Sequence, residues 1–222
     1  MTYRLPTALQ TDDDGRALDH LATYFGRVGA SRYTGSFFDT WPGNDADSWT
    51  ADDLVAVSFL SVFVPPLAAR RLLEQEADRF TELLRAVGPD RELSDEDAPI
   101  DPDWPAWRLY TRLRELPGIG RTIASKLCAR KRPRLLPIYD TVVGQVTSCQ
   151  TAQWVPLRDR LRADDGRLQD RLLRLRAVAE LGEEVSALRV YDVITWMDGK
   201  AGSVSPTTPE ERLAAKLAEE QE

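Results

Sequence analysis

Two short segments of the sequence carry residue types suited to chemistry on a phosphorylated sugar. The first is a glycine-containing turn at residues 116–121 (Leu-Pro-Gly-Ile-Gly-Arg), and the second is Asp140, which follows Gly120 by 20 residues. Glycine lets backbone N–H groups approach a phosphate oxygen directly. A carboxylate can stabilise positive charge on a sugar ring or activate a water molecule. Together they suggest a protein that holds DNA by its backbone and acts on a sugar.

The turn is expected to join the two helices of a hairpin at about residues 108–130. Pro117 should end the first helix, while Gly118 and Gly120 should allow positive φ angles. Ile119 should point inward, and the start of the second helix should add its dipole to a phosphate site. Such contacts fix DNA without reading its sequence, so the expected partner is double-stranded DNA bound through its phosphates. The predicted DNA-binding residues are Pro117, Gly118, Ile119, Gly120, Arg121, Thr122 and Lys126.

The charge distribution supports this partner more than the total charge does. The chain has a net charge of −7, which argues against a protein that coats nucleic acid. Residues 108–139, called the basic segment below, hold nine positive side chains and one negative, a local charge of +8. We interpret the basic segment as a phosphate-binding face. The alternative is that its arginines are solvated residues flanking ordinary helices.

The stretch from Leu116 to Thr141 resembles a known module of DNA repair enzymes. Residues 116–124 (Leu-Pro-Gly-Ile-Gly-Arg-Thr-Ile-Ala), followed by residues 137–141 (Pro-Ile-Tyr-Asp-Thr), look like the helix-hairpin-helix plus Gly/Pro-Asp module of base-excision DNA glycosylases, the superfamily of endonuclease III and the mismatch adenine glycosylase. The resemblance covers 26 residues. It implies an all-α fold of two lobes with the hairpin at their junction, and it places Asp140 at the position of the catalytic aspartate.

The chemistry of base removal explains why an aspartate would be needed. Breaking an N-glycosidic bond builds positive charge on the deoxyribose, which a carboxylate such as that of Asp140 stabilises while it orients or deprotonates water. The target base must first leave the base stack for a pocket. The alternative role for Asp140 is only to cap a helix N-terminus.

The sequence also departs from the family pattern. Members that nick the strand have a lysine after the position of Arg121, where this chain has Thr122, so a monofunctional glycosylase is implied. Lys126 lies one helical turn further on, and we interpret it as a phosphate contact, with a Schiff-base amine as the alternative. Val142 replaces the family's usual histidine, and residues 62–63 (Val-Phe) stand where polar wedge residues are expected. These departures favour a second hypothesis, a non-catalytic helix-hairpin-helix DNA-binding module or a nucleic-acid defence component.

A base pocket would need aromatic surfaces and a polar group. Candidates in the N-terminal half are Phe38 and Trp41, with Asp39 as a base reader, and Tyr139 is a further candidate beside Asp140. The alternative for the aromatic residues is core packing.

Composition limits the other possibilities. Two cysteines and one histidine exclude a four-cysteine iron–sulfur cluster and make a zinc site improbable, so no metal or cofactor is expected. No apolar run reaches the roughly 20 residues of a membrane span, and the N-terminus does not resemble a secretion signal, so a cytoplasmic location without membrane contact is expected. One helical domain is predicted over residues 1–199, with a polar tail at 200–222 that contains a possible short helix.

Helical periodicity runs through most of the domain, and strand patterns are weak. Thr50 is predicted to cap a helix with Asp53 in a capping box, and one continuous helix is predicted from Leu67 to about Val87. Residues 90–103 are predicted to be a solvated acidic loop. Further helices are expected at 104–115, after the turn, from Asp140 to about Thr147, within 155–181 and at 187–197.

Overall fold

The computed structural model describes residues 3–27, 33–149 and 153–202, and within these ranges it contains helices and no strand. The all-α fold class predicted from the sequence is confirmed. None of the described helices is both long enough and apolar enough to cross a membrane. The predicted tail helix lies outside the described residues, whereas the last helix, expected at 187–197, continues to Gly202.

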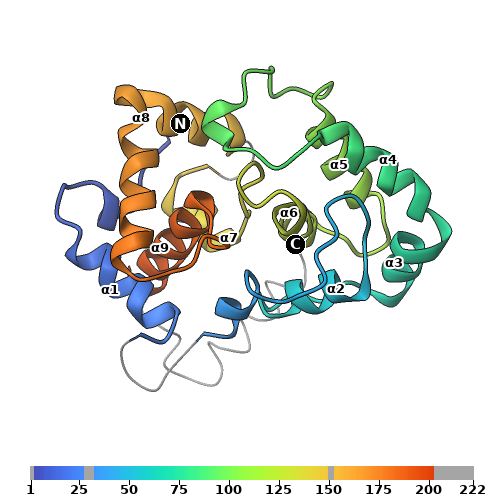
Figure 1. Cartoon of the computed structure of the whole chain (residues 1–222), viewed down its shortest axis with the longest axis horizontal. Helices are drawn as coiled ribbons and strands as arrows, with labels where there is room; N and C mark the ends of the chain where they lie inside the picture. The colour runs from blue at the N-terminus through green and yellow to red at the C-terminus, as the bar shows by residue number, and fades with distance from the viewer. Residues whose placement is uncertain (1–2, 28–32, 150–152, 203–222) are drawn as a thin grey trace.

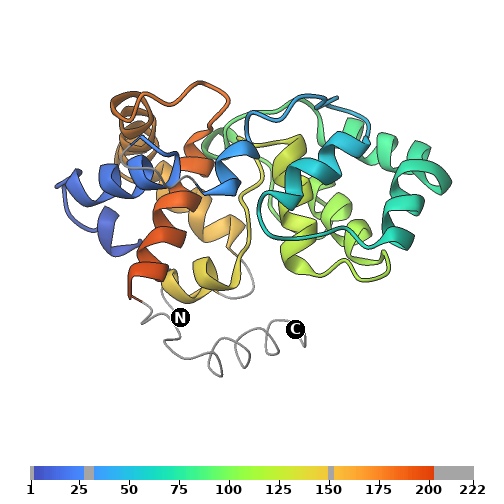
Figure 2. The same cartoon turned by 90° about the horizontal axis from the view of Figure 1, so that it is seen from below.

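The α-helices form two groups that lie side by side (Figures 1 and 2). The α9 group contains α1 (Gly15–Tyr24), α7 (Thr141–Val146), α8 (Trp154–Val178) and α9 (Ala187–Gly202). The α6 group contains α2 (Ala51–Ser58), α3 (Pro66–Arg70), α4 (Ala77–Val87), α5 (Pro105–Arg114) and α6 (Arg121–Lys131). Helix α9 contacts α1, α7 and α8, while α6 contacts α2 and α5. Residues 132–140, which are not helical, connect the groups, and one cluster of buried apolar side chains extends through both.

Helix α2 begins as the sequence predicts. The backbone N–H of Thr50 donates to Oδ2 of Asp53 at 2.9 Å, as in a capping box. The helix ends at Ser58, so the apolar spacing that continues through Val62 and Phe63 does not extend it. Ser61 takes a φ of +60°, and the side chain of Phe63 is left 76% exposed.

The predicted continuous helix over residues 67–87 is wrong, because the chain changes its helical form twice there. Helix α3 passes into a π-helical turn at Arg71–Gln75, and α4 starts only after Glu76, whose φ of −125° is not helical. The Glu76 carboxylate forms ion pairs with Arg71 and with Arg112 of α5. The helix thus breaks at Glu76, where the side chain contacts α5. The apolar spacing of residues 67–87 does not indicate this break.

Two other segments differ from their predicted form. Helix α8 is interrupted at residues 163–166, where Asp164 and Asp165 have φ angles of +53° and +54°. The acidic loop at 90–103 is not solvated throughout, because Glu96 is buried and accepts a hydrogen bond from Nε1 of Trp104 at 3.2 Å. The loop includes a 3-10 turn, η4 (Leu93–Asp95), that packs on α8. The acidic loop is thus one of the contacts between the two helix groups.

Candidate functional site

The glycine turn connects α5 to α6, and its two glycines have different backbone conformations. Gly118 has a φ of +74°, and a Cβ atom there would lie 2.8 Å from Cγ of Pro65. Gly120 has φ −82° and ψ −175°, so it is extended, and a Cβ there would meet nothing within 4 Å. The prediction of a positive φ is right for Gly118 and wrong for Gly120. Gly120 precedes the first residue of α6, where an extended conformation is normal for an N-cap.

The turn exposes backbone donors at the N-terminus of α6. Ile119 is buried as predicted, and its N–H donates to the carbonyl of Leu116 at 3.1 Å. Pro117, Gly118 and Gly120 are exposed, and the N–H groups of the two glycines have no acceptor among the described residues. Arg121 and Thr122, the first residues of α6, are half-buried. Exposed N–H groups before an 11-residue helix form a suitable binding site for an anion.

The C-terminal part of the basic segment points into the protein. Arg130 and Lys131 both pair with the fully buried Asp53, at 3.3 Å and 2.5 Å. Arg132 pairs with Asp47 at 2.9 Å and is itself 1% exposed. These three cations bind the α2 region to the end of α6 and do not form a surface for phosphate.

Most of the remaining cations of the basic segment also have acidic partners. Arg108 pairs with Asp103 at 2.7 Å, Arg112 with Glu76 and with Glu115, and Arg134 with Glu92 at 3.6 Å. The interpretation of the whole segment as a +8 phosphate-binding face is therefore wrong. Its partners, apart from Glu115, lie outside the segment in the sequence, so a local count of charges could not include them.

Asp140 is the N-cap of α7, and part of its carboxylate remains accessible. Oδ1 accepts a hydrogen bond from the N–H of Val142 at 3.0 Å, which fixes the side chain at the start of the helix. Oδ2 lies 3.5 Å from Nζ of Lys126, and the side chain is 21% exposed. Asp140 therefore caps α7 through Oδ1, while Oδ2 faces the ammonium of Lys126.

Lys126 is directed toward Asp140 and away from the exposed turn. Its side chain is 6% exposed, and Nζ donates to the carbonyl of Leu60 at 3.0 Å. Burial lowers the pKa of Lys126, while the nearby charges of Asp140 and Asp192 oppose that shift. The prediction that Lys126 contacts a DNA phosphate is wrong, because its ammonium is enclosed between α6, the end of α2 and the start of α7.

Two charged residues of α9 extend the cluster that begins at Asp140. Burial raises the pKa of Asp192 to about 6; Arg189 opposes the shift, and the charge of Asp140 adds to it. Arg189 pairs with Asp192 and with Asp39, the latter at 3.0 Å, and donates to the hydroxyl of Tyr24 at 2.9 Å. Arg189 and Asp192 are not among the site residues predicted from the sequence, although two opposite charges three positions apart in an apolar helix indicate a buried ion pair.

The predicted base pocket in the N-terminal half is not formed. Asp39 is 2% exposed and engaged by Arg189, and burial raises its pKa. Phe38 lies under the Arg189 guanidinium at 5.5 Å, whereas Nε1 of Trp41 donates to Asp52 at 3.2 Å. Phe38 and Asp39 line a small cavity, but neither Asp140 nor Trp41 does. These side chains pack and pair inside the protein and do not face Asp140.

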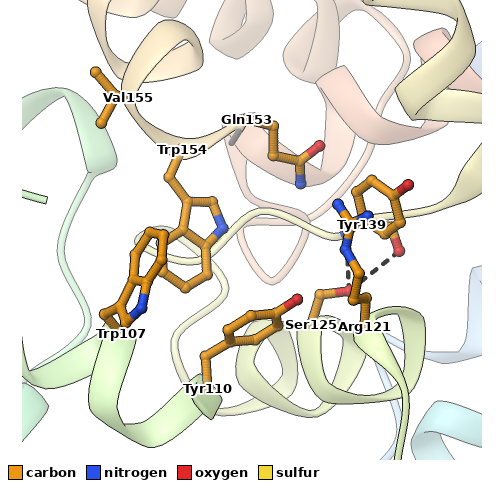
Figure 3. Close-up of a pocket in the computed structure, with 8 residues that line it drawn as sticks. All are labelled: Trp107, Tyr110, Arg121, Ser125, Tyr139, Gln153, Trp154 and Val155. Carbon is orange, nitrogen blue, oxygen red and sulfur yellow. Dashed lines mark hydrogen bonds between the residues drawn. The ribbon is translucent and has the colours of Figure 1, made fainter. Parts of the chain in front are cut away.

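Tyr139 lines a different and larger pocket, together with side chains of α5, α6 and α8 (Figure 3). Asp140 is extended, and successive side chains of an extended chain point to opposite sides, which separates Asp140 from this pocket. Asp140 lines neither pocket. The lining residues are Trp107, Tyr110, Arg121, Ser125, Tyr139, Gln153, Trp154 and Val155.

The cysteines and other metal-binding side chains form no candidate metal centre in the ranges that the structure describes. No group of three or more His, Cys, Asp or Glu side chains is placed there to hold a metal ion. Burial strongly raises the pKa of the Cys128 thiol, so this cysteine is a packing residue.

Residues 17–199 match the model of a protein family. The chain belongs to DUF6308, a family of unknown function. The matched region includes the glycine turn, Lys126, Asp140 and the charged residues of α9. No curated protein and no solved structure matches the chain.

Proposed function

We propose that the chain is a monofunctional DNA N-glycosylase in which Asp140 is the catalytic residue. The observation that carries the proposal is the position of Asp140. Its carboxylate is partly exposed at the N-terminus of α7, and a buried ammonium 3.5 Å from Oδ2 holds it. That ammonium belongs to α6, the helix whose N-terminus presents the exposed turn. Perturbed and mutually charged groups of this kind gather at functional sites more often than elsewhere.

The chemistry assigns a separate task to each part of the site. The N–H groups of Gly118 and Gly120, with the dipole of α6, would bind a phosphate of the damaged strand. As the bond from C1′ to the base nitrogen breaks, the base leaves with the bonding electrons, and Asp140 stabilises the cationic sugar. Water then adds to C1′ and gives a proton to Asp140 or to solvent. The product is an abasic site in an intact strand.

Lys126 has a positioning role in this scheme. Its Nζ is committed to the Leu60 carbonyl and to Asp140, so it restricts the rotation of the Asp140 carboxylate. The amine is not presented to an incoming sugar, because the side chain is 6% exposed. This geometry favours hydrolysis by water over attack by a lysine.

The test is base release from duplexes that carry alkylated, deaminated, oxidised or otherwise modified bases. Abasic sites are revealed by cleavage with hot alkali, which strand-nicking enzymes do not require. Asp140→Asn should abolish release from any base that the wild-type chain removes. Asp170→Asn, at an exposed position of α8, is the matched control and should retain activity. The proposal fails if no modified base is released, or if the Asp140 variant is fully active.

The second candidate is a non-catalytic DNA-binding module, favoured by the observation that Asp140 caps α7 and lines neither pocket. It predicts DNA binding through the turn with no base release from any duplex. Binding that weakens with salt and is lost when Gly120 is replaced by a bulky residue, together with inactivity on every modified base, would identify this function.

A further inference from the structure

The pocket beside Tyr139 has the lining and the location of a ligand site, and Asp140 does not line it. It lies between α5 and α6 on one side and the start of α8 on the other, and Arg121, the first residue of α6, is part of its wall. Its lining is mostly hydrophobic and aromatic with a few polar groups, as in many small-molecule sites. The pocket therefore adjoins the exposed turn, and Asp140 is not among the residues that line it.

The walls of this pocket are mainly aromatic. The ring of Trp154 meets those of Trp107 and Tyr110 edge to face, with centroids 5.4 Å and 5.2 Å apart. Figure 3 shows the two indoles on one side of the space, and Tyr139 with Arg121 on the other. Indole rings on one side, and a guanidinium stacked on Tyr139 on the other, favour a planar ring as the ligand. Nucleobases stack on aromatic side chains and on arginine alike, whatever the base.

The charge of the pocket lining indicates whether a planar ligand should be cationic or anionic. The guanidinium of Arg121 lies 4.1 Å from the centroid of the Tyr139 ring, and the lining includes no carboxylate. An organic cation would meet like charge there, whereas a ligand with an anionic group would not. Exposed N–H groups at the start of α6 add a place for that anionic group beside Arg121.

Gln153 supplies a polar group inside the pocket. Its Nε2 donates to the carbonyl of Ile138 at 2.9 Å, which fixes the orientation of the carboxamide. Its Oε1 is the hydrogen-bond acceptor that this side chain can offer to a ligand. The exocyclic amino group of a nucleobase is a suitable donor.

We propose that this pocket is a nucleotide site, with an unpaired nucleobase between the aromatic walls and its phosphate at the start of α6. The base can belong to a single-stranded segment of nucleic acid or to a free mononucleotide, since both present the same ring and phosphate. The proposal goes beyond glycosylase activity and does not require it, because Asp140 takes no part in the pocket.

The test uses the intrinsic tryptophan fluorescence of the full chain, because Trp107 and Trp154 line the pocket. The probes are deoxyadenosine 5′-monophosphate, an unmodified single-stranded oligodeoxynucleotide, the same strand in a duplex, and deoxyribose 5-phosphate. A nucleotide or the single strand should quench fluorescence saturably, while the sugar phosphate, which has no base, should not. Quenching by the mononucleotide supports a free nucleotide as the ligand, and quenching by the strand alone supports an unpaired base in a chain.

Substitutions of residues that line the pocket test whether the nucleotide binds there. Trp107→Leu should weaken binding about fivefold or more, whereas Trp107→Phe should retain most of it. Val155→Phe, at the pocket wall, should also weaken binding by occupying the space without removing an aromatic face. Asp140→Asn should bind like the wild type, so loss of base release and loss of this site are distinguishable. The proposal is overturned if neither the mononucleotide nor the single strand binds saturably. It is also overturned if Trp107→Leu and Val155→Phe bind these probes as tightly as the wild type does.

Discussion

The ammonium of Lys126 lies 3.5 Å from Oδ2 of Asp140, and this pair joins α6 to the N-terminus of α7. It connects the two parts of the chain that the sequence singles out, the helix after the glycine turn and the distant carboxylate. The pair also replaces the phosphate contact expected of Lys126. A cation enclosed in this way acts on its neighbour in the protein and not on an approaching strand.

The enclosure of Lys126 predicts that the chain forms no Schiff base with an abasic sugar. The wild-type chain, incubated with a duplex containing an abasic site and treated with borohydride, should give no covalent adduct on a denaturing gel. The reason is that Nζ is held by the Leu60 carbonyl and by Asp140. An adduct that disappears in Lys126→Met would show instead that the amine reaches the sugar and that the enzyme is a lyase.

The two glycines of the turn should respond differently to alanine. Gly118→Ala should destabilise the fold by about 1–2 kcal/mol, because its φ of +74° and the 2.8 Å approach of Pro65 both oppose a Cβ. Gly120→Ala should change stability by less than about 0.5 kcal/mol, because a Cβ there meets nothing and the backbone is extended. Urea denaturation of both variants measures these differences.

DNA binding by Gly120→Ala then tests the turn as a phosphate site. The new methyl group would stand beside the exposed N–H and hinder the approach of a phosphate, so affinity for duplex DNA should fall while the fold is intact. Unchanged affinity in this variant would remove the turn from the DNA-binding surface.

These details show which features a sequence can predict. The cap of α2, the burial of Ile119 and the place of Asp140 at a helix start follow from residues within a few positions of one another, so local patterns were sufficient. The prediction that the basic segment forms a phosphate-binding face was wrong because the partners of its cations are distant in the sequence. Arg130 meets Asp53, 77 residues earlier, and no local count of charge contains that contact. The aromatic pocket likewise depends on Trp154, which lies far along the chain from Trp107 and Tyr110.

The buried carboxyl of Asp192 should make stability depend on pH. Burial raises its pKa from 3.8 to about 6, so the folded protein holds this proton more tightly than the unfolded chain does. The contribution of this group to folding is therefore most favourable at low pH and falls as the pH rises from about 4 to about 6. Asp192→Asn should remove that decrease from the free energy of unfolding measured by urea between pH 4 and 7.

The control for Asp192 is Asp170→Asn at the exposed position on α8, which should keep the wild-type pH dependence. If the free energy of unfolding changed with pH in the same way in the wild type and in Asp192→Asn, the raised pKa of Asp192 would be contradicted. Such a result would show that the ion pair with Arg189 keeps the carboxylate charged throughout this range.

Asp53 should be among the most sensitive positions for stability. It is fully buried and pairs with Arg130 and Lys131, which are buried too, and it also accepts the N–H of Thr50 at the start of α2. Asp53→Asn leaves two buried cations without a negative charge, so it should destabilise the protein by about 3–5 kcal/mol. Glu74→Gln, which breaks an exposed pair with Arg70, should change stability by less than about 1 kcal/mol. Thermal or urea unfolding compares the two, and similar small losses in both would show that Arg130 and Lys131 do not depend on Asp53 for their burial.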